Sequence, residues 1–395
     1  MLLGIYLALR ELWRGKGKFL LFSLVIGLIT LLILFVSALG EGLANSNKEY
    51  IEKLNAELLV FRENSDLNIQ ASSVDKADLR AVKRVEGVAD AGLIGLSRVS
   101  IVPAVPAVPG ASGGSAKAVD VALVGVEHGR PGEPPVLRGS SLLRKRADEA
   151  IIDSNVARQS GLDVGDEFTV RSVQAATEEF YTLKIVGVTD SRRITFNPSI
   201  FVPLLTWEKV KPQATSGADE AELVSNVIAV KLHDPATWQQ TMQNIKSSVD
   251  KVDVADLVTA YEATPGFQAQ QSTLSTQRNF LLLIGVLVIG GFFQIQTLQK
   301  VPQIGMLKAI GASNLAVAVA ALVQIVAVTV IGALIGGMAS LGLSLVLPPT
   351  VPIVFEPAVV FSTIVYLLII GPLGGLVSIR YALRVEPLTA LGLAS

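Results

Sequence analysis

Four long apolar stretches constrain the fold of this chain more than any other feature. They occupy residues 19–43, 274–299, 315–347 and 358–379. Each can supply a helix that crosses the hydrocarbon core of a bilayer, which is about 30 Å thick and needs about 20 apolar residues. The predicted fold class is a membrane α-helical protein with four transmembrane helices. The long interval between the first two spans predicts a large mixed α/β extracytoplasmic domain inserted between helices 1 and 2.

The first apolar stretch could also be a secretory signal peptide, because Val36-Ser37-Ala38 resembles a cleavage site. Its length argues against that alternative, since the apolar core of a signal peptide has about 7–15 residues. We interpret it as a retained span. Residues 1–18 alternate apolar with basic side chains and predict an amphipathic helix in the membrane interface, with Trp13 at headgroup level.

Lysine and arginine flank the predicted spans asymmetrically. They precede the first span, separate the second from the third and follow the fourth, as Arg10, Arg14, Lys16, Lys18, Lys300, Lys308, Arg380 and Arg384. The loop between the third and fourth spans has neither residue type. Basic short segments face the cytoplasm, whereas long domains translocate regardless of charge. The prediction is a multi-pass plasma-membrane protein with both termini and the 380–395 tail in the cytoplasm, and the domain of residues 44–273 outside.

Within that domain, β-rich and helical patterns follow one another. Strands are predicted at residues 56–61, 119–126, 149–152, 167–173, 181–188, 200–202 and 227–232. Helices are predicted at residues 73–85, 154–160, 235–249 and 254–262. The proline-rich segment of residues 103–115 predicts an extended loop.

Composition excludes several kinds of function. A net charge of −1 argues against a nucleic-acid partner, which requires a basic face. The chain has no cysteine, which rules out thiol catalysis and cysteine-ligated metals. His128 and His233 are too few and too far apart in sequence to suggest a metal site, and no P-loop motif for ATP is present. We therefore predict no catalytic residue and no intrinsic cofactor or metal.

Residues 300–314 lie between the second and third spans and are too polar for lipid. Pro302 suits the first turn of a helix and Gly311 suits its end. Ile304, Leu307 and Ile310 recur at helical spacing, which predicts one apolar face. This short amphipathic helix could be a passive turn or the docking point of another protein.

Glycines and prolines suggest irregularities in the spans. The third span is longer than a bilayer requires, so it either projects outward or breaks near Gly336-Gly337. The Gly332 and Gly336 pair favours close helix packing. A kink is expected at Gly371-Pro372 in the fourth span.

Glu41 is the strongest single candidate for a functional side chain. It lies at the outer end of the first span between Gly40 and Gly42. An ionisable residue at a membrane is a functional candidate, although it could also simply meet water there. Phe35 and Leu39 lie on a neighbouring helical face, which could pack against another helix or form an apolar ligand wall.

Four segments resemble the MacB/FtsX-type (type VII) ABC transporter permeases. They are residues 1–18, residues 149–153 with 161–166, residues 303–312 and residues 384–391. The stretches 34–43 and 297–311 also resemble the haem-exporting Hrt-type permeases of Gram-positive bacteria. In that family residues 302–311 (Pro302, Gln303, Ile304, Gly305, Met306, Leu307, Lys308, Ala309, Ile310 and Gly311) would form the coupling segment for a separate ATPase.

The resemblance implies a homodimer bound to two copies of a cytoplasmic ABC ATPase, which would bind ATP and magnesium. Motion would reach the outer domain through long helices, and haem would enter laterally from membrane lipid. Glu41 would then accept a hydrogen bond or ligate the haem iron, with Phe35, Ser37 and Leu39 shaping the pocket. Two alternatives stay open, namely export of another amphiphile such as a lipid, glycolipid or antimicrobial peptide, and non-transporting activation of an outer hydrolase.

Overall fold

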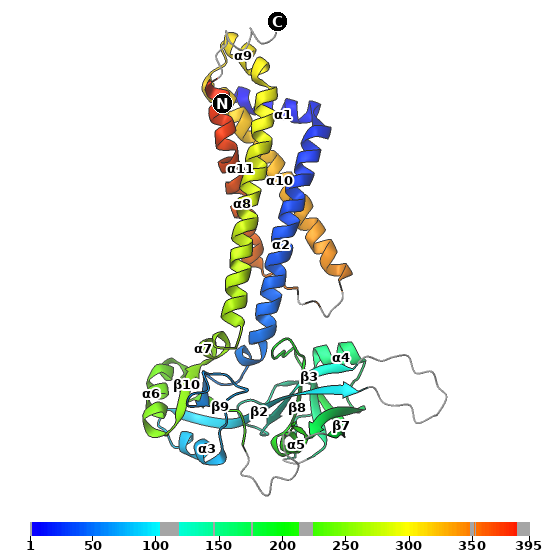
Figure 1. Cartoon of the computed structure of the whole chain (residues 1–395), viewed down its shortest axis with the longest axis vertical. Coiled ribbons are helices and arrows are strands. Elements are labelled where there is room, and N and C mark those ends of the chain that lie inside the picture. The colour runs from blue at the N-terminus through cyan, green and yellow to red at the C-terminus, as the bar shows by residue number, and fades with distance from the viewer. Residues whose placement is uncertain are drawn as a thin grey trace, which may run out of the picture. The chain divides into compact units, whose positions relative to one another are not determined.

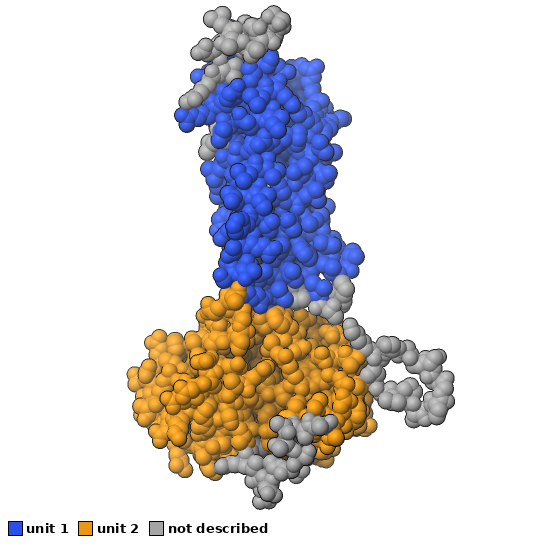
Figure 2. Space-filling model, viewed as in Figure 1, with its two compact units in different colours: residues 1–43, 270–395 blue, residues 44–269 orange. Residues whose placement is uncertain are grey.

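The computed structural model of the protein describes residues 2–102, 118–144, 147–174, 177–212, 224–347, 351 and 353–384. These residues form two compact units, shown in separate colours in Figure 2. Unit 1 comprises residues 1–43 and 270–395, and unit 2 comprises residues 44–269. The predicted proline-rich loop and residues 385–395 of the predicted tail lie outside the described residues.

Unit 1 is built from helices. They are α1 (Leu2–Arg14), most of α2 (Lys16–Glu52), most of α8 (Phe267–Gln299), α9 (Val301–Ala309), α10 (Asn314–Val346) and α11 (Pro357–Arg384). Among the described residues, α2, α8, α10 and α11 are long and apolar enough to cross a membrane. The short helices α1 and α9 lie at one end of this bundle (Figure 1). The four-helix prediction is therefore confirmed.

Helix boundaries differ from the sequence prediction at several points. The first helix ends at Arg14, and Lys16 already begins α2, which continues to Glu52 without a break. The last helix extends to Arg384, beyond the predicted end at residue 379. Of the two alternatives for the third span, the break near Gly336-Gly337 is wrong, because α10 is continuous there. Pro372 lies inside a continuous α11.

Close helix crossings explain several glycines in unit 1. A Cβ added to Gly332 would lie 2.9 Å from the backbone oxygen of Ser23, and one at Gly336 would overlap the backbone of Gly27. The backbones of α2 and α10 therefore approach too closely for larger side chains. Such approaches increase van der Waals contact where lipid gives no hydrophobic driving force. This confirms the packing interpretation of the Gly332 and Gly336 pair.

Unit 2 contains a mixed ten-stranded sheet. Its strands are β1 (Leu58–Arg62), β2 (Val88–Val102), β3 (Val119–Val126), β4 (Val136–Gly139), β5 (Glu149–Asp153), β6 (Glu167–Gln174), β7 (Thr177–Thr189), β8 (Ser199–Pro203), β9 (Val227–Leu232) and β10 (Val252–Asp256). Their order is β10-β1-β9-β2-β3-β8-β5-β7-β4, and β6 pairs with β2 and β7. The β3/β8 and β5/β7 pairs are parallel, and the remaining pairs are antiparallel.

Both faces of this sheet are covered. Along β1, Leu58 and Val60 face one apolar core, while Leu59 and Phe61 face a second core that also contains Tyr50 of α2. Successive side chains of a strand alternate between faces, so one strand contributes to both cores. The remaining helices of unit 2 are α3 (Lys76–Val82), α4 (Ser154–Ser160), α5 (Leu204–Val210), α6 (Trp238–Ser248) and α7 (Leu257–Glu262), with a 3₁₀ turn at Pro235–Thr237.

The sequence prediction missed β2, β4 and β10. Residues 254–262 were expected to form one helix, but the chain changes from strand to helix at Asp256. Asp256 has an extended backbone, and its side chain accepts a hydrogen bond from the N–H of Val258, 3.1 Å away. It therefore acts as the N-cap of α7, which ends the strand and starts the helix.

Candidate functional site

Local sequence defines both ends of α9, the helix within the coupling segment. Pro302 occupies its first turn, where a missing N–H leaves no helical bond unmade. At the other end Gly311 has a φ of +99°, and its N–H donates to the oxygen of Lys308 at 3.0 Å. The N–H of Ala312 donates to the oxygen of Leu307 at 2.9 Å, which completes a Schellman motif. The short helix predicted here is confirmed.

Helices α1 and α11 hold α9 through its own side chains and through the residue before it. Ile304 is buried, with 8% of its surface exposed. Lys308 donates from Nζ to the backbone oxygen of Leu383 in α11 at 2.7 Å. Lys300 forms an ion pair of 2.5 Å with Glu11 of α1. A displacement of α9 would therefore act on α1 and α11 directly.

The predicted single apolar face of α9 is only partly present. Ile304 is buried, Leu307 is 37% exposed, and Ile310 is 81% exposed. Ile310 departs because it is the C-cap residue and lies past the last helical turn. Met306 is also half exposed. Of the other coupling residues, the structure buries Gly305 and leaves Gln303 and Ala309 exposed.

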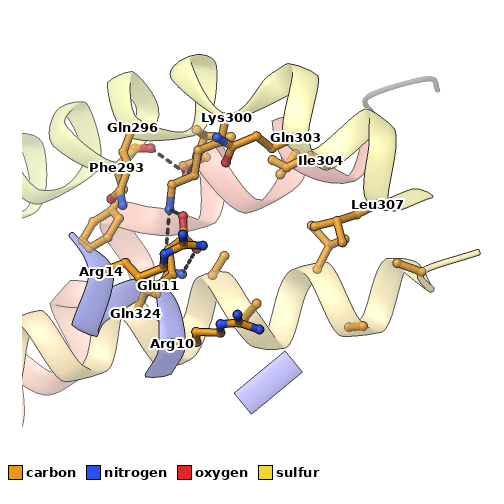
Figure 3. Close-up of a pocket in the computed structure, with 18 residues that line it drawn as sticks. Arg10, Glu11, Arg14, Phe293, Gln296, Lys300, Gln303, Ile304, Leu307 and Gln324 are labelled. Carbon is orange, nitrogen blue, oxygen red and sulfur yellow. Dashed lines mark hydrogen bonds and ion pairs between the residues drawn. The ribbon is translucent and has the colours of Figure 1, made fainter. Parts of the chain in front are cut away.

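A pocket of about 390 Å³ lies beside α9, and we call it the α1–α9 pocket (Figure 3). Its lining includes Arg10, Glu11 and Arg14 of α1 and Gln296 of α8. Helices α9, α10 and α11 complete it, with Leu307 and small alanine side chains forming much of the apolar part. The N-terminal helix α1 and the four consecutive helices α8 to α11 therefore meet at one partly open cavity.

Three polar groups in this pocket form a closed network (Figure 3). Gln324 donates from Nε2 to Glu11 Oε2 at 2.6 Å, and Lys300 donates from Nζ to Gln324 Oε1 at 3.2 Å. Lys300 also pairs with Glu11, as described above. Burial lowers the pKa of Lys300 from its ordinary value, and the Glu11 carboxylate opposes that shift.

Three other polar groups of the same pocket have no such partners. Within the described part of the chain, neither Arg10 nor Arg14 forms an ion pair or a side-chain hydrogen bond. Gln296 is only 3% exposed, yet both polar atoms of its side chain lack a hydrogen-bond partner there. The pocket thus combines two uncompensated guanidinium groups with one buried, unsatisfied amide.

A second pocket, of about 180 Å³, lies between α2 and α8, and we call it the Glu41 pocket. Ser37 and Glu41 line it from α2, while Gln271, Ser275 and Arg278 line it from α8. The Ser37 hydroxyl is buried without a partner among the described residues, and the same holds for Arg278 Nε. A carboxylate, a guanidinium and hydroxyl groups are therefore brought to one site.

The four predicted ligand residues do not all reach this pocket. Ser37 and Glu41 line it together, because residues four apart lie on one helical face. Phe35 and Leu39 are half-buried on α2 but do not line it. Arg278 was missed from sequence, although a lone cation two residues before Phe280, where the apolar run begins, was a usable signal. Among the described residues, no cluster of histidine and acidic side chains could hold a metal ion.

Family models cover most of the chain. The MacB-like periplasmic core domain matches residues 19–248, and the FtsX-like permease C-terminal model matches residues 280–387. The chain belongs to the MacB/FtsX family of ABC transporter permeases. This confirms the resemblance inferred from sequence, the fold class with its inserted domain, and a multi-pass plasma-membrane protein with an extracellular domain.

Full-length relatives share about a quarter of their residues with this chain. A Staphylococcus haemolyticus protein, named as the permease HrtB of a hemin transport system, is 23% identical over 98% of this chain and 99% of its own length. An uncharacterized ABC transporter permease of Mycobacterium bovis is also 23% identical, over 98% of this chain and 99% of its own. The solved extracellular domain of the ABC-type transporter YknZ has a TM-score of 0.35 and 13% identity, covering 50% of this chain and 98% of that domain.

Proposed function

We propose that this chain is the permease subunit of an ABC-type efflux pump that exports haem. Two copies of the chain would assemble with two copies of a cytoplasmic ATPase subunit, which binds ATP and magnesium. Haem would enter laterally from the membrane near the Glu41 pocket. The observation that carries the proposal is the placement of Glu41 and Arg278 in one pocket between α2 and α8, in a chain with full-length similarity to hemin transport permeases.

The attachments of α9 support energy input at the coupling segment. Lys300 and Lys308 connect this segment to α1, α10 and α11, so a partner pushing on α9 would move the bundle as a whole. Exposed Met306 and Ile310 offer apolar contact area for that partner. The distribution of basic residues supports a cytoplasmic location for this end of unit 1 under the positive-inside rule.

Helix α2 supports transmission of that motion to the extracellular domain. It runs without a break from Lys16 to Glu52, and its last turns belong to unit 2. There Glu49 accepts a hydrogen bond from the Ser191 hydroxyl at 2.9 Å, and Lys53 Nζ donates to the backbone oxygen of Ser191 at 2.6 Å. We call this cluster, with Asp190, Arg192 and Arg193, the α2 anchor. It is the means by which a moving α2 would carry unit 2 with it.

The chemistry of the Glu41 pocket suits one edge of a haem. The two haem propionates would pair with the Arg278 guanidinium, and carboxylate–guanidinium pairs are among the stronger polar contacts. Glu41 would supply an oxygen ligand to the iron or accept a hydrogen bond. The cavity of about 180 Å³ is smaller than a usual ligand site of about 300–1,000 Å³. It would hold the polar edge, and the apolar ring would remain against lipid or the second copy.

A second candidate, export of a different amphiphile, is favoured by the position of the apolar residues. Phe35 and Leu39 do not line the Glu41 pocket, and among the described residues no aromatic side chain lines it. A lipid or peptide with a charged head would use the same carboxylate and guanidinium without requiring a flat ring-binding surface.

The decisive experiment measures how haem changes ATP hydrolysis by the purified complex of permease and ATPase. Glu41→Gln removes the charge and keeps the side-chain size. The measured quantity is the increase in ATPase rate on adding haem, relative to the rate of the same variant without haem. We expect Glu41→Gln to need about tenfold more haem for the same increase, because it loses one charge-assisted contact. Glu52→Gln is the matched control, since Glu52 is on the same helix and outside the pocket.

The outcomes separate the two candidates. A haem requirement raised about tenfold in Glu41→Gln but not in Glu52→Gln supports haem export. Equal haem responses in the two variants would refute the assignment of Glu41. Stimulation by an anionic lipid or an amphipathic peptide, with no response to haem in the unaltered complex, would replace the first candidate with the second.

A further inference from the structure

The α1–α9 pocket carries a positive charge that the protein itself leaves uncompensated. Arg10, Arg14 and Lys300 contribute three cationic groups, and Glu11 contributes one acidic group that is already paired with Lys300. Two guanidinium groups therefore line the cavity without an acidic partner among the described residues. Guanidinium groups bind carboxylate and phosphate oxygens in a bidentate manner, so this lining favours an anionic ligand.

Gln296 provides an independent indication that the pocket receives a ligand. Its side chain is almost fully buried and lines the cavity, yet neither its oxygen nor its nitrogen has a partner in the described structure. A buried amide without hydrogen bonds is costly, and such groups in native proteins call for an explanation. The nearby Gln324, in the same pocket, is fully engaged with Glu11 and Lys300. The free hydrogen-bonding capacity is thus specific to Gln296.

Apart from Thr297, Gln303 and Ser378, the rest of the lining is apolar. Leu307 of α9 and the alanines of α10, including Ala316 and Ala320, form it together with Phe293 of α8. A volume of about 390 Å³ lies within the range of small-molecule sites, about 300–1,000 Å³. The cavity is half open, so a ligand could extend beyond it. A lining that combines cationic groups with apolar side chains matches a molecule with an anionic head and an apolar tail.

We propose that the α1–α9 pocket binds the phosphate-bearing headgroup of an anionic membrane phospholipid, through Arg10, Arg14 and the amide of Gln296. Basic pockets between transmembrane helices at a membrane surface are a known way to hold such headgroups. The first part of an acyl chain would lie along the alanine face of α10. Because α1 and α9 both line the pocket, the lipid would join the interfacial helix to the coupling segment. The site is separate from the Glu41 pocket and does not depend on what the protein transports.

The test measures phospholipid binding by the full-length chain purified in detergent. Phosphatidylglycerol and phosphatidylcholine are titrated separately, and bound lipid is counted by native mass spectrometry. We expect saturable binding of phosphatidylglycerol in preference to phosphatidylcholine. Arg14→Gln should weaken the binding of phosphatidylglycerol by about tenfold, the loss of one charge-assisted contact. No preference for phosphatidylglycerol would overturn the proposal.

Lys16→Gln is the matched control for Arg14→Gln. Lys16 lies two residues away in the same basic segment, is exposed, and does not line the pocket. Unchanged binding in Lys16→Gln beside weakened binding in Arg14→Gln supports a defined site. A similar loss in both variants indicates a diffuse attraction of basic residues to anionic lipid and overturns the proposal.

Gln296→Met keeps the test informative if an arginine variant is poorly folded. It removes the free amide and leaves a side chain of similar length in the cavity. We expect weaker binding of phosphatidylglycerol with no fall in the thermal unfolding midpoint. If Gln296→Met binds phosphatidylglycerol as tightly as the unaltered chain, the amide of Gln296 does not contribute to lipid binding and the proposal is overturned.

A competition experiment distinguishes a lipid from a free anion. Inorganic phosphate and glycerol 3-phosphate are added to the complex with phosphatidylglycerol. Retention of the lipid at millimolar concentrations of either anion supports a lipid site that needs the acyl chain. Displacement by inorganic phosphate alone would keep a phosphate site at Arg10 and Arg14 and overturn its assignment to a lipid.

Discussion

The α2 anchor in unit 2 and the α1–α9 pocket in unit 1 contain similar charged and polar residues but differ in how many of them have partners. In the anchor, every charged side chain has a partner, and the buried Arg192 donates to Asp190 and to the backbone oxygen of Lys53, each at 2.8 Å. In the pocket, Arg10 and Arg14 have none among the described residues. A fully satisfied polar cluster holds one geometry, because any movement leaves a charge unpaired. A partly satisfied cluster leaves hydrogen-bonding capacity for a ligand.

The largest expected effect comes from removing the buried cation of the anchor. Arg192→Met keeps an apolar stem of similar length but removes the guanidinium that donates to Asp190 and to the backbone oxygen of Lys53. We expect a loss of about 3 kcal/mol in the free energy of unfolding of unit 2, as for other broken buried pairs. Urea unfolding of the full-length chain, followed by fluorescence of Trp207 and Trp238, measures it.

Arg171→Met serves as the control for this variant. Arg171 pairs with Glu178 at 3.2 Å, but both side chains are more than a third exposed. Surface pairs contribute about 0–1 kcal/mol, so this variant should unfold almost like the unaltered protein. Equal losses of unfolding free energy in the two variants would show that the contacts of Arg192 in the anchor contribute no more stability than an exposed surface pair.

Two buried glutamines in unit 1 sharpen the comparison within a single pocket. Gln324 is 5% exposed and partnered, whereas Gln296 is 3% exposed and unpartnered. Gln324→Met should cost about 2 kcal/mol because it removes two hydrogen bonds, to Glu11 and from Lys300, although these two groups stay paired with each other. Gln296→Met should cost nothing or stabilise slightly, since it removes an unsatisfied group.

The thermal unfolding midpoint of the full-length chain in lipid-free detergent compares these two variants. Equal midpoint losses would mean that Gln296 has partners in solution, and the contrast between anchor and pocket would then disappear.

The smallest expected effect is a pH dependence in the anchor. Partial burial opposes ionisation of Asp190, but Arg192, Thr189 and Lys53 together lower its pKa below the ordinary 3.8. A lowered carboxyl pKa stabilises the fold above the unfolded value, and that stabilisation is lost as the pH falls through the folded value. Asp190→Asn should therefore cost about 1 kcal/mol at pH 7, after allowance for the one-third exposure of Asp190.

Urea unfolding at pH 7 and at pH 3 checks this dependence. The difference between Asp190→Asn and the unaltered chain should shrink below pH 3.8 as the unaltered carboxyl takes up its proton. A difference that is the same at both pH values would mean that the carboxylate charge does not stabilise the anchor.

Features that depend on neighbours in sequence were predicted well. The four spans follow from the length of the apolar runs, and the end of α9 follows from Gly311, whose φ of +99° suits glycine. The longest strand, β2, was missed because Gly92, Gly95 and Arg98 weaken its strand pattern. Its strand character comes from pairing with β3, β6 and β9, which are distant in sequence.

The same distinction between local sequence and long-range packing applies to the candidate sites. Ser37 and Glu41 could be predicted to share a helical face, because α2 is a regular helix. Arg278 could not be placed beside them, because that requires the packing of α8 against α2. Nothing in the local sequence distinguishes Gln296 from other polar residues near the end of a span, and only the structure revealed that it is buried and, among the described residues, unpartnered.

By itself, the sequence determined the number of spans, the inserted domain and the short helix between the second and third spans. Each depends on hydrophobic length or on the backbone preferences of single residues, which act over a few positions. Only the tertiary structure decided which side chains meet at the Glu41 and α1–α9 pockets, and which of them remain unpartnered. Those properties arise where helices far apart in the chain approach each other, and burial there makes each missing hydrogen bond costly.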